Sequence, residues 1–385
     1  MTDFERKALL PAGLRDILPP DAAFEADIVE RLVRLFQAYG YDRVRPPLIE
    51  FEDSLLSGAG VAVGPQTFRL MDPVSQRMMG VRADITPQIA RLARTRLSAA
   101  ARPLRLSYAG EVLRVRGTQL RPERQVLQVG AELIGSAAPA ADAEIIAMAA
   151  TALDSVGMRG LSVDLTVPRL VPTVLGAHGL DSADATPLRA ALDRKDPDGV
   201  AAHGGDAANT LVALLRATGQ IGPALDALAT LDLPPVAAQE RDRVAQVAAL
   251  VGQATPDVML TLDPVENRGF EYHTGVGFTI FAAGLPGELA SGGRYRAHGD
   301  DDADADGERA TGVTLYVDTI LATLTPDANQ RRILLPADAV ATDARALRAE
   351  GWATIAALEP GGDTRDEARR LGCTHILGPD GPEQV

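Results

Sequence analysis

Two neighbouring segments with alternating side chains constrain the fold of this chain most. Residues 104–116 and 124–134 alternate between side-chain types on either side of a turn at Gly117. A period of two residues is typical of β-strands, because successive side chains of a strand point to opposite faces. The sequence therefore predicts two strands, the second returning from the turn beside the first.

The polar face of this strand pair carries an unusual set of groups. Arg114 and Arg116 share one face of the first strand, and Arg124, Gln128 and Glu132 share one face of the second. If the strands pair, guanidinium, amide and carboxylate groups can converge on one surface. Guanidinium groups are forked donors that suit phosphate or carboxylate oxygens. The pattern indicates a ligand site, with a solvated face of ion pairs as the alternative.

Composition excludes several classes of function. Asp and Glu total 52 against 38 Lys and Arg, for a net charge of −14, whereas proteins that bind long nucleic acids carry a basic face. The single cysteine, Cys373, is typical of a reducing compartment. The N-terminal residues are charged where a signal peptide would be apolar, and no run reaches about 18 apolar residues. We expect a cytoplasmic protein with no membrane partner.

Helical spacing predicts further elements. A helix from Asp21 is expected to be capped by Asp21 and ended by Gly40. Residues 84–97 predict a second helix with Pro87 in its first turn, and residues 137–160 an alanine-rich third. A strand is predicted at LSVDLTV, and strand patterns return at ENRGFEYHTGVGFTIFA and ELASGGRYR.

The sequence changes character twice along the chain. Residues 170–255 consist mainly of Ala/Leu helical segments and predict a helical insertion. The segment TPDANQ at 325–330 predicts a linker, and a β-α-β-α-β pattern follows it. We therefore expect a core domain at 1–325 that contains the insertion, and a small α/β unit at 326–385.

Other motifs are weak. DADADG (302–307) matches the start of a calcium loop, but the twelfth position is Val313 where a bidentate glutamate is needed, so a surface loop is expected. GAGVAVG (58–64) lacks dinucleotide-binding spacing and predicts a flexible loop. Metal-ligand spacing of histidines and P-loop motifs are absent. We expect no metal and no cofactor, and His273, beside Tyr272, is either structural or part of a site.

The ordered motifs resemble class II histidyl-tRNA synthetases. GYDRVRPPLIE, VRADITPQIARL, PLRLSYAGEVLRVRG with RQVLQVGAELIG, RGFEYHTG and SGGRY occur in the order of that family, over roughly residues 10–321. The resemblance implies an α+β fold with a class II aminoacyl-tRNA synthetase-like core, in which helices flank a mainly antiparallel sheet. It also implies a dimer, a helical insertion near 170–255, and a sheet surface on which the family binds ATP and histidine.

The ATP side departs from the family pattern. Arg114 matches the arginine of the second motif, but Arg116 replaces a glutamate that seats the adenine. Thr319 replaces the arginine of the third motif, and Tyr316 replaces a glycine inside it. A threonine cannot supply the charge that holds phosphate, so we expect no aminoacylation. The residues after Leu321 are too few for the family's anticodon-binding domain, which with the acidic charge argues against tRNA as a partner.

The amino-acid side is better preserved. By resemblance, the histidine-pocket candidates are Asp84, Thr86, Arg114, Gln128, Glu132, Arg268, Tyr272, His273 and Tyr295. Carboxylates suit an ammonium group, arginines suit a carboxylate, and polar groups suit an imidazole. Inherited architecture without a surviving ligand is the alternative.

A synthetase-like chain with these losses resembles the regulatory subunits of ATP phosphoribosyltransferase. The resemblance implies a non-catalytic subunit that activates the short catalytic phosphoribosyltransferase and mediates histidine feedback in the first step of histidine biosynthesis, within a hetero-octamer. Two alternatives stay open: a short histidine-activating ligase or aminoacyl transferase, and a free-standing histidine sensor.

Overall fold

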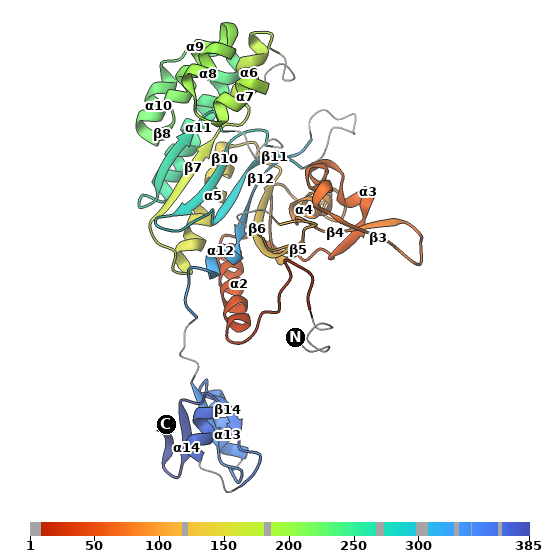
Figure 1. Ribbon diagram of the computed structural model, residues 1–385, viewed down its shortest axis with the longest axis vertical. Helices are drawn as coiled ribbons and strands as arrows, with labels where there is room; N and C mark the ends of the chain where they lie inside the picture. Colours follow the sequence, from red (N-terminus) through yellow and green to blue (C-terminus); the bar gives the residue numbers. More distant parts are fainter. Residues whose placement is uncertain are drawn as a thin grey trace. The chain divides into compact units, whose positions relative to one another are not determined.

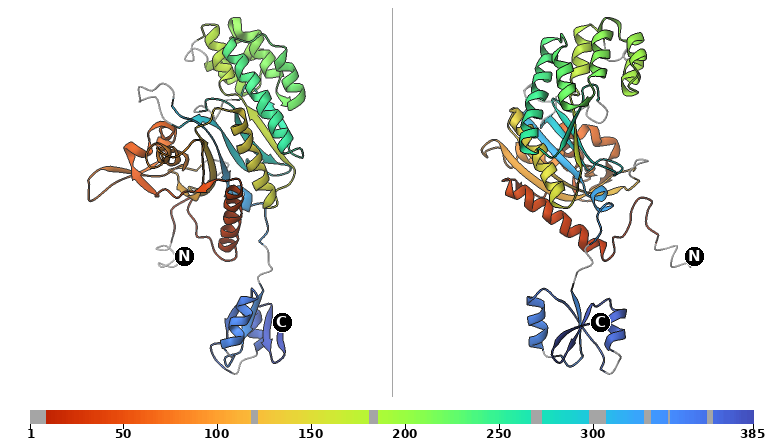
Figure 2. Two further views of the ribbon diagram at one scale, coloured as in Figure 1. Left: turned by 180° about the vertical axis from the view of Figure 1, so that it is seen from behind. Right: turned by 90° about the vertical axis from the view of Figure 1, so that its left-hand side faces the viewer.

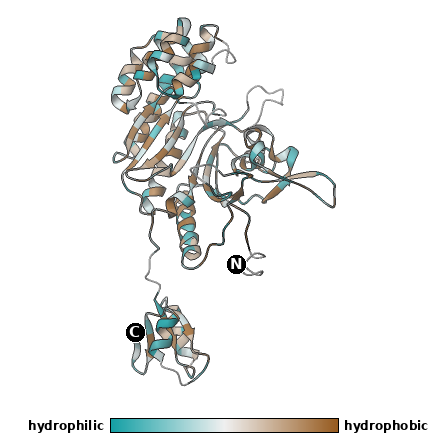
Figure 3. Cartoon of the chain, viewed as in Figure 1, coloured by the Kyte–Doolittle hydropathy of each residue, from teal (hydrophilic) through white to brown (hydrophobic). Residues whose placement is uncertain are grey.

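The computed structural model describes residues 9–117, 122–180, 186–266, 273–297, 307–326, 331–339, 341–360 and 364–385. The chain divides into two compact units, Met1–Leu324 and Thr325–Val385. Hydrophobic cores form separately in each unit, around the strands of its own sheet. The strands of the large sheet carry hydrophobic residues over much of their length (Figure 3).

The first unit is built on a nine-stranded sheet within the described residues. Its strands lie in the order β1 (Asp42–Arg43), β5 (Leu104–Leu113), β6 (Gln125–Ile134), β12 (Arg309–Tyr316), β11 (Ala290–Arg296), β10 (Gly277–Ala282), β7 (Leu161–Thr166), β9 (Met259–Asp263) and β8 (Gly219–Gln220). The β1–β5 and β7–β9 pairs are parallel, and the other neighbours are antiparallel. The predicted mainly antiparallel sheet is confirmed, as is the pairing of β5 with β6.

Helices α2 (Asp21–Ala38) and α5 (Pro139–Ser155) cover one face of this sheet (Figures 1 and 2). Val129, Ala131 and Leu133 of β6 point into the core that these helices form. Because strand residues alternate between faces, Gln128 and Glu132 point to the opposite face.

The end of α2 follows the sequence prediction, but its start does not. Gly40 has φ +83° and its N–H donates to Gln37 O at 2.9 Å, while the Tyr41 N–H donates to Phe36 O at 3.1 Å. This is a Schellman ending, which favours glycine. Asp21 is the first helical residue instead of the cap, since the preceding position is Pro20 and no side chain caps the helix. The Asp21 carboxylate still lies in the first turn, where it suits the helix dipole.

The other face of the large sheet is partly covered by α4 (Thr86–Arg94), which is shorter than the predicted 84–97. Beside it lies a three-stranded sheet with the order β2 (Ile49–Phe51), β4 (Met78–Val81) and β3 (Phe68–Met71). α3 (Glu52–Leu55) and the 3₁₀ helix η1 (Gly58–Gln66) connect β2 to β3. The prediction of a flexible loop at 58–64 is wrong. The structure folds that segment against the chain so closely that a Cβ at Gly60 would overlap the backbone of Leu55.

The helical insertion gathers at one end of the large sheet (Figure 1). Its elements are α6 (Leu170–Ala177), α7 (Thr186–Asp193), α8 (Pro197–His203), η2 (Gly205–Ala207), α9 (Ala208–Arg216), β8, α10 (Ile221–Ala229) and α11 (Pro235–Ala254). The first unit ends with α12 (Val317–Leu321). The third predicted helix spans 139–155 instead of 137–160, because proline at its start and Gly157 after its end limit it.

The second unit contains the predicted β-α-β-α-β pattern and one further strand. Its sheet has the order β14 (Ala353–Ala356), β13 (Arg332–Leu335), β15 (His375–Gly378) and β16 (Gly381–Gln384). α13 (Ala341–Ala349) and α14 (Thr364–Arg370) lie on opposite faces of it (right-hand view of Figure 2). The calcium-like segment at 302–306 and most of the predicted linker at 325–330 lie outside the described residues.

Candidate functional site

The face of the large sheet opposite α2 and α5 carries a set of polar side chains. Pairing in register brings Glu132 of β6, Gly312 of β12 and Gly293 of β11 into one row across three strands. A neighbouring row holds Thr314 and Ser291. Because residues directly opposite each other in paired strands project to the same face, both rows line one surface.

Glycines make this surface concave beside Glu132. A Cβ at Gly312 would overlap the Glu132 carboxylate, and a Cβ at Gly293 would lie 2.7 Å from His273 Cδ2. The two side chains therefore lie over bare backbone. The pocket between them has a volume of about 20 Å³, room for about one water molecule. Among the described residues this space is smaller than an amino acid.

Glu132 is buried within a shell of hydroxyl groups. Thr86 Oγ1 donates to Oε1 at 3.0 Å, Tyr295 O–H donates to Oε2 at 2.8 Å, and Tyr108 O–H donates to Oε1 at 3.4 Å. Burial raises the pKa of the Glu132 carboxyl to about 8; the nearby Asp84 charge adds to this rise, and the hydroxyl donors oppose it. Glu132 therefore changes its charge near neutral pH, where a cationic ligand favours the ionised form.

Asp84 joins this site through a short hydrogen-bond network. Gln128 Nε2 donates to Asp84 Oδ2 at 2.9 Å, and Gln128 Oε1 accepts the Ile85 N–H at 3.1 Å. Asp84 Oδ1 accepts the Thr86 N–H at 2.8 Å. These bonds fix the turn before α4, so that the Thr86 hydroxyl reaches Glu132. Thr86 thus links two carboxyl groups: its backbone N–H donates to Asp84, and its hydroxyl donates to Glu132.

Most of the candidates from the sequence come together here. Those at the pocket or in its network are Asp84, Thr86, Gln128, Glu132, His273 and Tyr295. His273 is buried and lines the pocket. Arg268 and Tyr272 lie outside the described residues.

Arg114 is separated from this cluster. β5 ends at Leu113 instead of reaching residue 116, and Gln128 lies opposite Gly110 in the β5–β6 register. Arg114 is four residues further along the chain, roughly 13 Å at the rise of a strand, and Glu132 is more distant still. Residues on one face are not thereby neighbours, so the predicted convergence of arginine, amide and carboxylate is not formed. A role for Arg114 in a histidine pocket stays a prediction that this register does not support.

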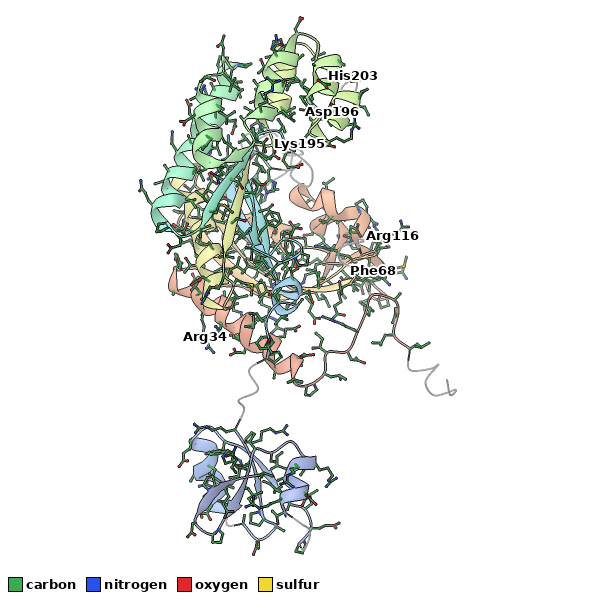
Figure 4. The ribbon with its side chains drawn as sticks, turned by 60° about the vertical axis from the view of Figure 1, so that its left-hand side comes forward. Arg34, Phe68, Arg116, Lys195, Asp196 and His203 are labelled. Carbon is green, nitrogen blue, oxygen red and sulfur yellow. The ribbon has the colours of Figure 1, made fainter. Side chains whose placement is uncertain are left out.

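The arginines of this segment contact other groups. The Arg114 N–H donates to Arg124 O at 2.7 Å, and Thr67 faces Arg114 in an isolated bridge. The Arg124 guanidinium lies 4.9 Å from the centre of the Phe68 ring and donates to Arg114 O at 3.2 Å. Arg116 is exposed (Figure 4). The segment therefore ties β3 to the end of β5.

Three residues that line or border the pocket were missed by the sequence reasoning. They are Tyr108, Ser291 and Thr314. Tyr108 O–H lies 3.3 Å from Thr314 Oγ1. Tyr108 lies two residues before Gly110 in β5, and Gly110 lies opposite Gln128. The alternation of side chains along the strand could therefore have placed Tyr108 on the face of the site. The position of Thr314 depends on the pairing of β12 with β6, which a local pattern does not reveal.

Tyr316 and Thr319 stand where the resemblance implied lost nucleotide contacts. Tyr316 lies opposite Gln128 in the β12–β6 register, so its ring projects from the site face. Its hydroxyl lies 2.6 Å from Ser291 Oγ, which holds the ring across β11. Thr319 lies in α12.

Arg294 anchors the pocket strand from the opposite face of the sheet. Its guanidinium is 1% exposed and pairs with Asp142, with Nε–Oδ2 at 3.0 Å and Nη2–Oδ1 at 2.8 Å. It also donates to Ser136 O at 2.7 Å and Ala138 O at 3.1 Å. Because its neighbour Gly293 lines the pocket, this contact fixes β11 to the start of α5.

Two further classes of site are absent from the described part of the chain. Across those residues, no group of three His, Cys, Asp or Glu side chains is arranged to hold a metal ion. No helix among them combines the length and apolar character needed to cross a membrane.

Comparison with known proteins gives consistent results. A family model described as histidyl-tRNA synthetase matches residues 13–320. Two curated proteins named ATP phosphoribosyltransferase regulatory subunit are each 56% identical to this chain. The one from Paramagnetospirillum magneticum aligns over 100% of both chains, and the one from Rhodospirillum centenum over 96% of this chain and 94% of its own.

A solved structure shows the same fold. It is described as an ATP phosphoribosyltransferase regulatory subunit/histidyl-tRNA synthetase from Bacillus halodurans. Its TM-score is 0.79 at 24% identity, over 94% of this chain and 96% of that one. The class II synthetase-like architecture expected from the sequence is therefore confirmed.

The sheet, its polar face and the helical insertion define a histidyl-tRNA synthetase-like protein of class II. Within that class, the chain belongs to the family of ATP phosphoribosyltransferase regulatory subunits. These relatives are named as regulatory subunits and not as catalytic ones.

Proposed function

We propose that this chain binds the short catalytic ATP phosphoribosyltransferase, activates it, and makes it responsive to histidine in the first step of histidine biosynthesis. The observation that carries this proposal is 56% identity over the full length to a protein named as that regulatory subunit. In physical terms, contact with this chain favours the active state of the catalytic subunit, and histidine binds the two states unequally.

The described site supports a regulatory role over an enzymatic one. Tyr316 is held by Ser291 across the sheet at 2.6 Å, where the resemblance places a nucleotide. Thr319 supplies no positive charge for phosphate. Without these contacts the chain lacks the electrostatic clamp on which amino-acid activation depends.

The chemistry of the Glu132 pocket supports histidine as the ligand. Glu132 and Asp84 suit the ammonium and imidazole groups, and Thr86 and Tyr295 offer hydroxyls. Arg268 and Tyr272 remain candidates for the same pocket. Because the pocket of about 20 Å³ is smaller than histidine, binding requires the pocket to open, which gives histidine a means to favour one conformation.

The same proposal includes a synthetase-like dimer within a hetero-octamer. The three-stranded sheet and the residues next to its strands expose large apolar side chains. Their exposed fractions are 48% for Leu48, 38% for Ile49, 62% for Met71 and 90% for Val74. Exposed apolar surface of this kind favours burial against another chain. We place the assembly in the cytoplasm, with neither tRNA nor a membrane as a partner; the net charge of −14 supports the first of these exclusions.

Mixing the purified chain with a short catalytic phosphoribosyltransferase tests the proposal. We expect the chain to raise phosphoribosyl transfer from its basal level, histidine to lower it again, and native mass spectrometry to detect a complex that contains both chains. Thr86→Val removes a hydroxyl from the pocket, so about tenfold more histidine should be needed for the same inhibition. Thr95→Val, on the exposed end of the same helix, should behave as the unaltered chain.

Two results would overturn the proposal. One is an unchanged rate of phosphoribosyl transfer when the two chains are mixed. The other is histidine-dependent exchange of pyrophosphate into ATP by the chain alone, because that activity defines an amino-acid-activating enzyme.

A further inference from the structure

A second cavity, open to solvent, lies on the helical insertion between α8, α9 and α10, and its lining residues are exposed or half-exposed. Its volume is about 440 Å³, which falls in the range of roughly 300–1,000 Å³ of small-molecule sites. None of its lining residues belongs to the Glu132 pocket. The insertion therefore has space for a ligand of its own.

One face of α9 forms a wall of this cavity. Asn209, Val212, Ala213 and Arg216 all line it, and their spacing of three, four and seven residues places them on a single helix face. The wall is apolar in the middle and polar at both ends. Such a surface suits a small ligand with an apolar part and a charged group.

The other walls complete this pattern. α8 contributes Asp198, and the segment at and after the end of α10 contributes Ala227 and Leu231. An apolar floor thus lies near one carboxylate and one guanidinium. Ligand sites are commonly built in this way, with a few polar groups around an apolar surface.

The two charged groups have no partner within the described chain. Neither Asp198 nor Arg216 makes a hydrogen bond or ion pair there, with each other or with another described residue. Nearby charges are paired by contrast: Lys195 Nζ lies 2.6 Å from Asp263 Oδ2, and Asp196 accepts the Gly199 N–H at 3.0 Å (Figure 4). Asp198 and Arg216 are therefore available to a ligand of mixed charge.

We propose that this cavity binds a free α-amino acid with an apolar side chain. Arg216 pairs with the carboxylate, Asp198 with the ammonium group, and Val212 and Leu231 contact the side chain. This site goes beyond the proposed regulation by histidine. It is a second small-molecule site, located in the insertion, and it can be tested without the phosphoribosyltransferase partner.

Isothermal titration of the full chain tests this site, with L-leucine, L-isoleucine and L-valine as probes. We expect saturable binding of at least one of them. For L-leucine, its amide and 4-methylpentanoate serve as matched compounds that lack the carboxylate or the ammonium group, and each should bind about tenfold more weakly or worse. Hydrogen exchange should show protection by the amino acid in α8, α9 and α10.

Variants assign the binding to the two charges. Arg216→Met and Asp198→Asn should each weaken binding about tenfold or more, and Arg216→Lys should lie between Arg216→Met and the unaltered chain, because lysine keeps the charge without the fork. Arg34→Met removes an exposed arginine of α2 (Figure 4) and should leave binding unchanged. The proposal is overturned if no probe binds, if the amide binds as well as L-leucine, or if the Arg216 variants that fold retain full affinity.

Discussion

At the scale of single residues, Glu132 has the most direct physical consequence. The residue is 1% exposed, its carboxyl group accepts hydrogen bonds from Thr86 and Tyr295, and burial raises the pKa of that carboxyl to about 8. The folded chain thus holds a proton on Glu132 over a pH range in which the unfolded chain has released it. Folding stability is linked to pH through that difference.

Glu132→Gln should remove this dependence on pH. For the unaltered chain, the contribution of Glu132 to the free energy of unfolding is greatest below about pH 4.5 and falls as the pH rises to about 8. The variant stays neutral, so relative to the unaltered chain it should gain up to about 1.4 kcal/mol per pH unit across that window. Urea unfolding at several pH values measures this gain. Glu350→Gln, at an exposed position, is the control that should keep the pH dependence of the free energy of unfolding seen in the unaltered chain. If Glu132→Gln shows that same pH dependence, the assignment to Glu132 is contradicted.

Sequence and resemblance identified much of the pocket at this scale. The sequence placed Glu132, Thr86 and Tyr295 among the pocket candidates, but it did not predict the hydrogen bonds between them. Tyr108 and Thr314 were missed, because their approach depends on the register of β5, β6 and β12, and β12 is distant from the other two strands in the chain. Arg114 shows the converse error: side-chain alternation gave its face, but the separation along the strand keeps it from Glu132.

At the scale of elements, a buried ion pair joins the pocket strand to its supporting helix. Arg294 of β11 and Asp142 of α5 are 1% and 2% exposed. Arg243 of α11 also approaches Asp142, with Nε–Oδ2 at 3.6 Å. Burial raises the pKa of Asp142, and the arginines, Arg294 first, counteract it. The charges therefore connect β11, α5 and the insertion helix α11.

Asp142→Asn should destabilise the first unit by roughly 3–5 kcal/mol, because it leaves the Arg294 guanidinium buried without a countercharge. Asp154→Asn is the matched control: its partner Arg159 and Asp154 are 70% and 64% exposed, so the loss should be at most about 1 kcal/mol. Chemical denaturation followed by far-ultraviolet circular dichroism compares the two. Equal losses would mean that the buried pair adds nothing beyond a surface contact.

At the scale of the whole molecule, the unfolding of the two units can be followed by two different spectroscopic signals. The chain has one tryptophan, Trp352, and it lies in the second unit with its ring centre 4.8 Å from that of His375. Most helices and strands belong to the first unit. Tryptophan fluorescence thus follows the second unit, while circular dichroism follows mainly the first.

We propose that 1–325 and 326–385 unfold as separate domains. Fluorescence and circular dichroism should then give transitions at different denaturant concentrations, because probes coincide only when unfolding is a single cooperative step. A chain of residues 1–325 should keep the circular dichroism midpoint of the full chain. Coincident transitions, or a shifted midpoint after truncation, would show that the units unfold together.

The sequence by itself determined the types of element and the protein class. Local periodicity defined the β5–β6 hairpin, α2 with its Gly40 ending, and the β-α-β-α-β pattern of the second unit, because these depend on neighbouring residues. Motif order identified the synthetase-like core. Tertiary structure alone decided which polar residues meet, since strand register sets the contacts of Glu132, and it also formed the cavity that Asp198 and Arg216 share. These contacts join residues far apart in the chain, and no local pattern encodes the distance between them.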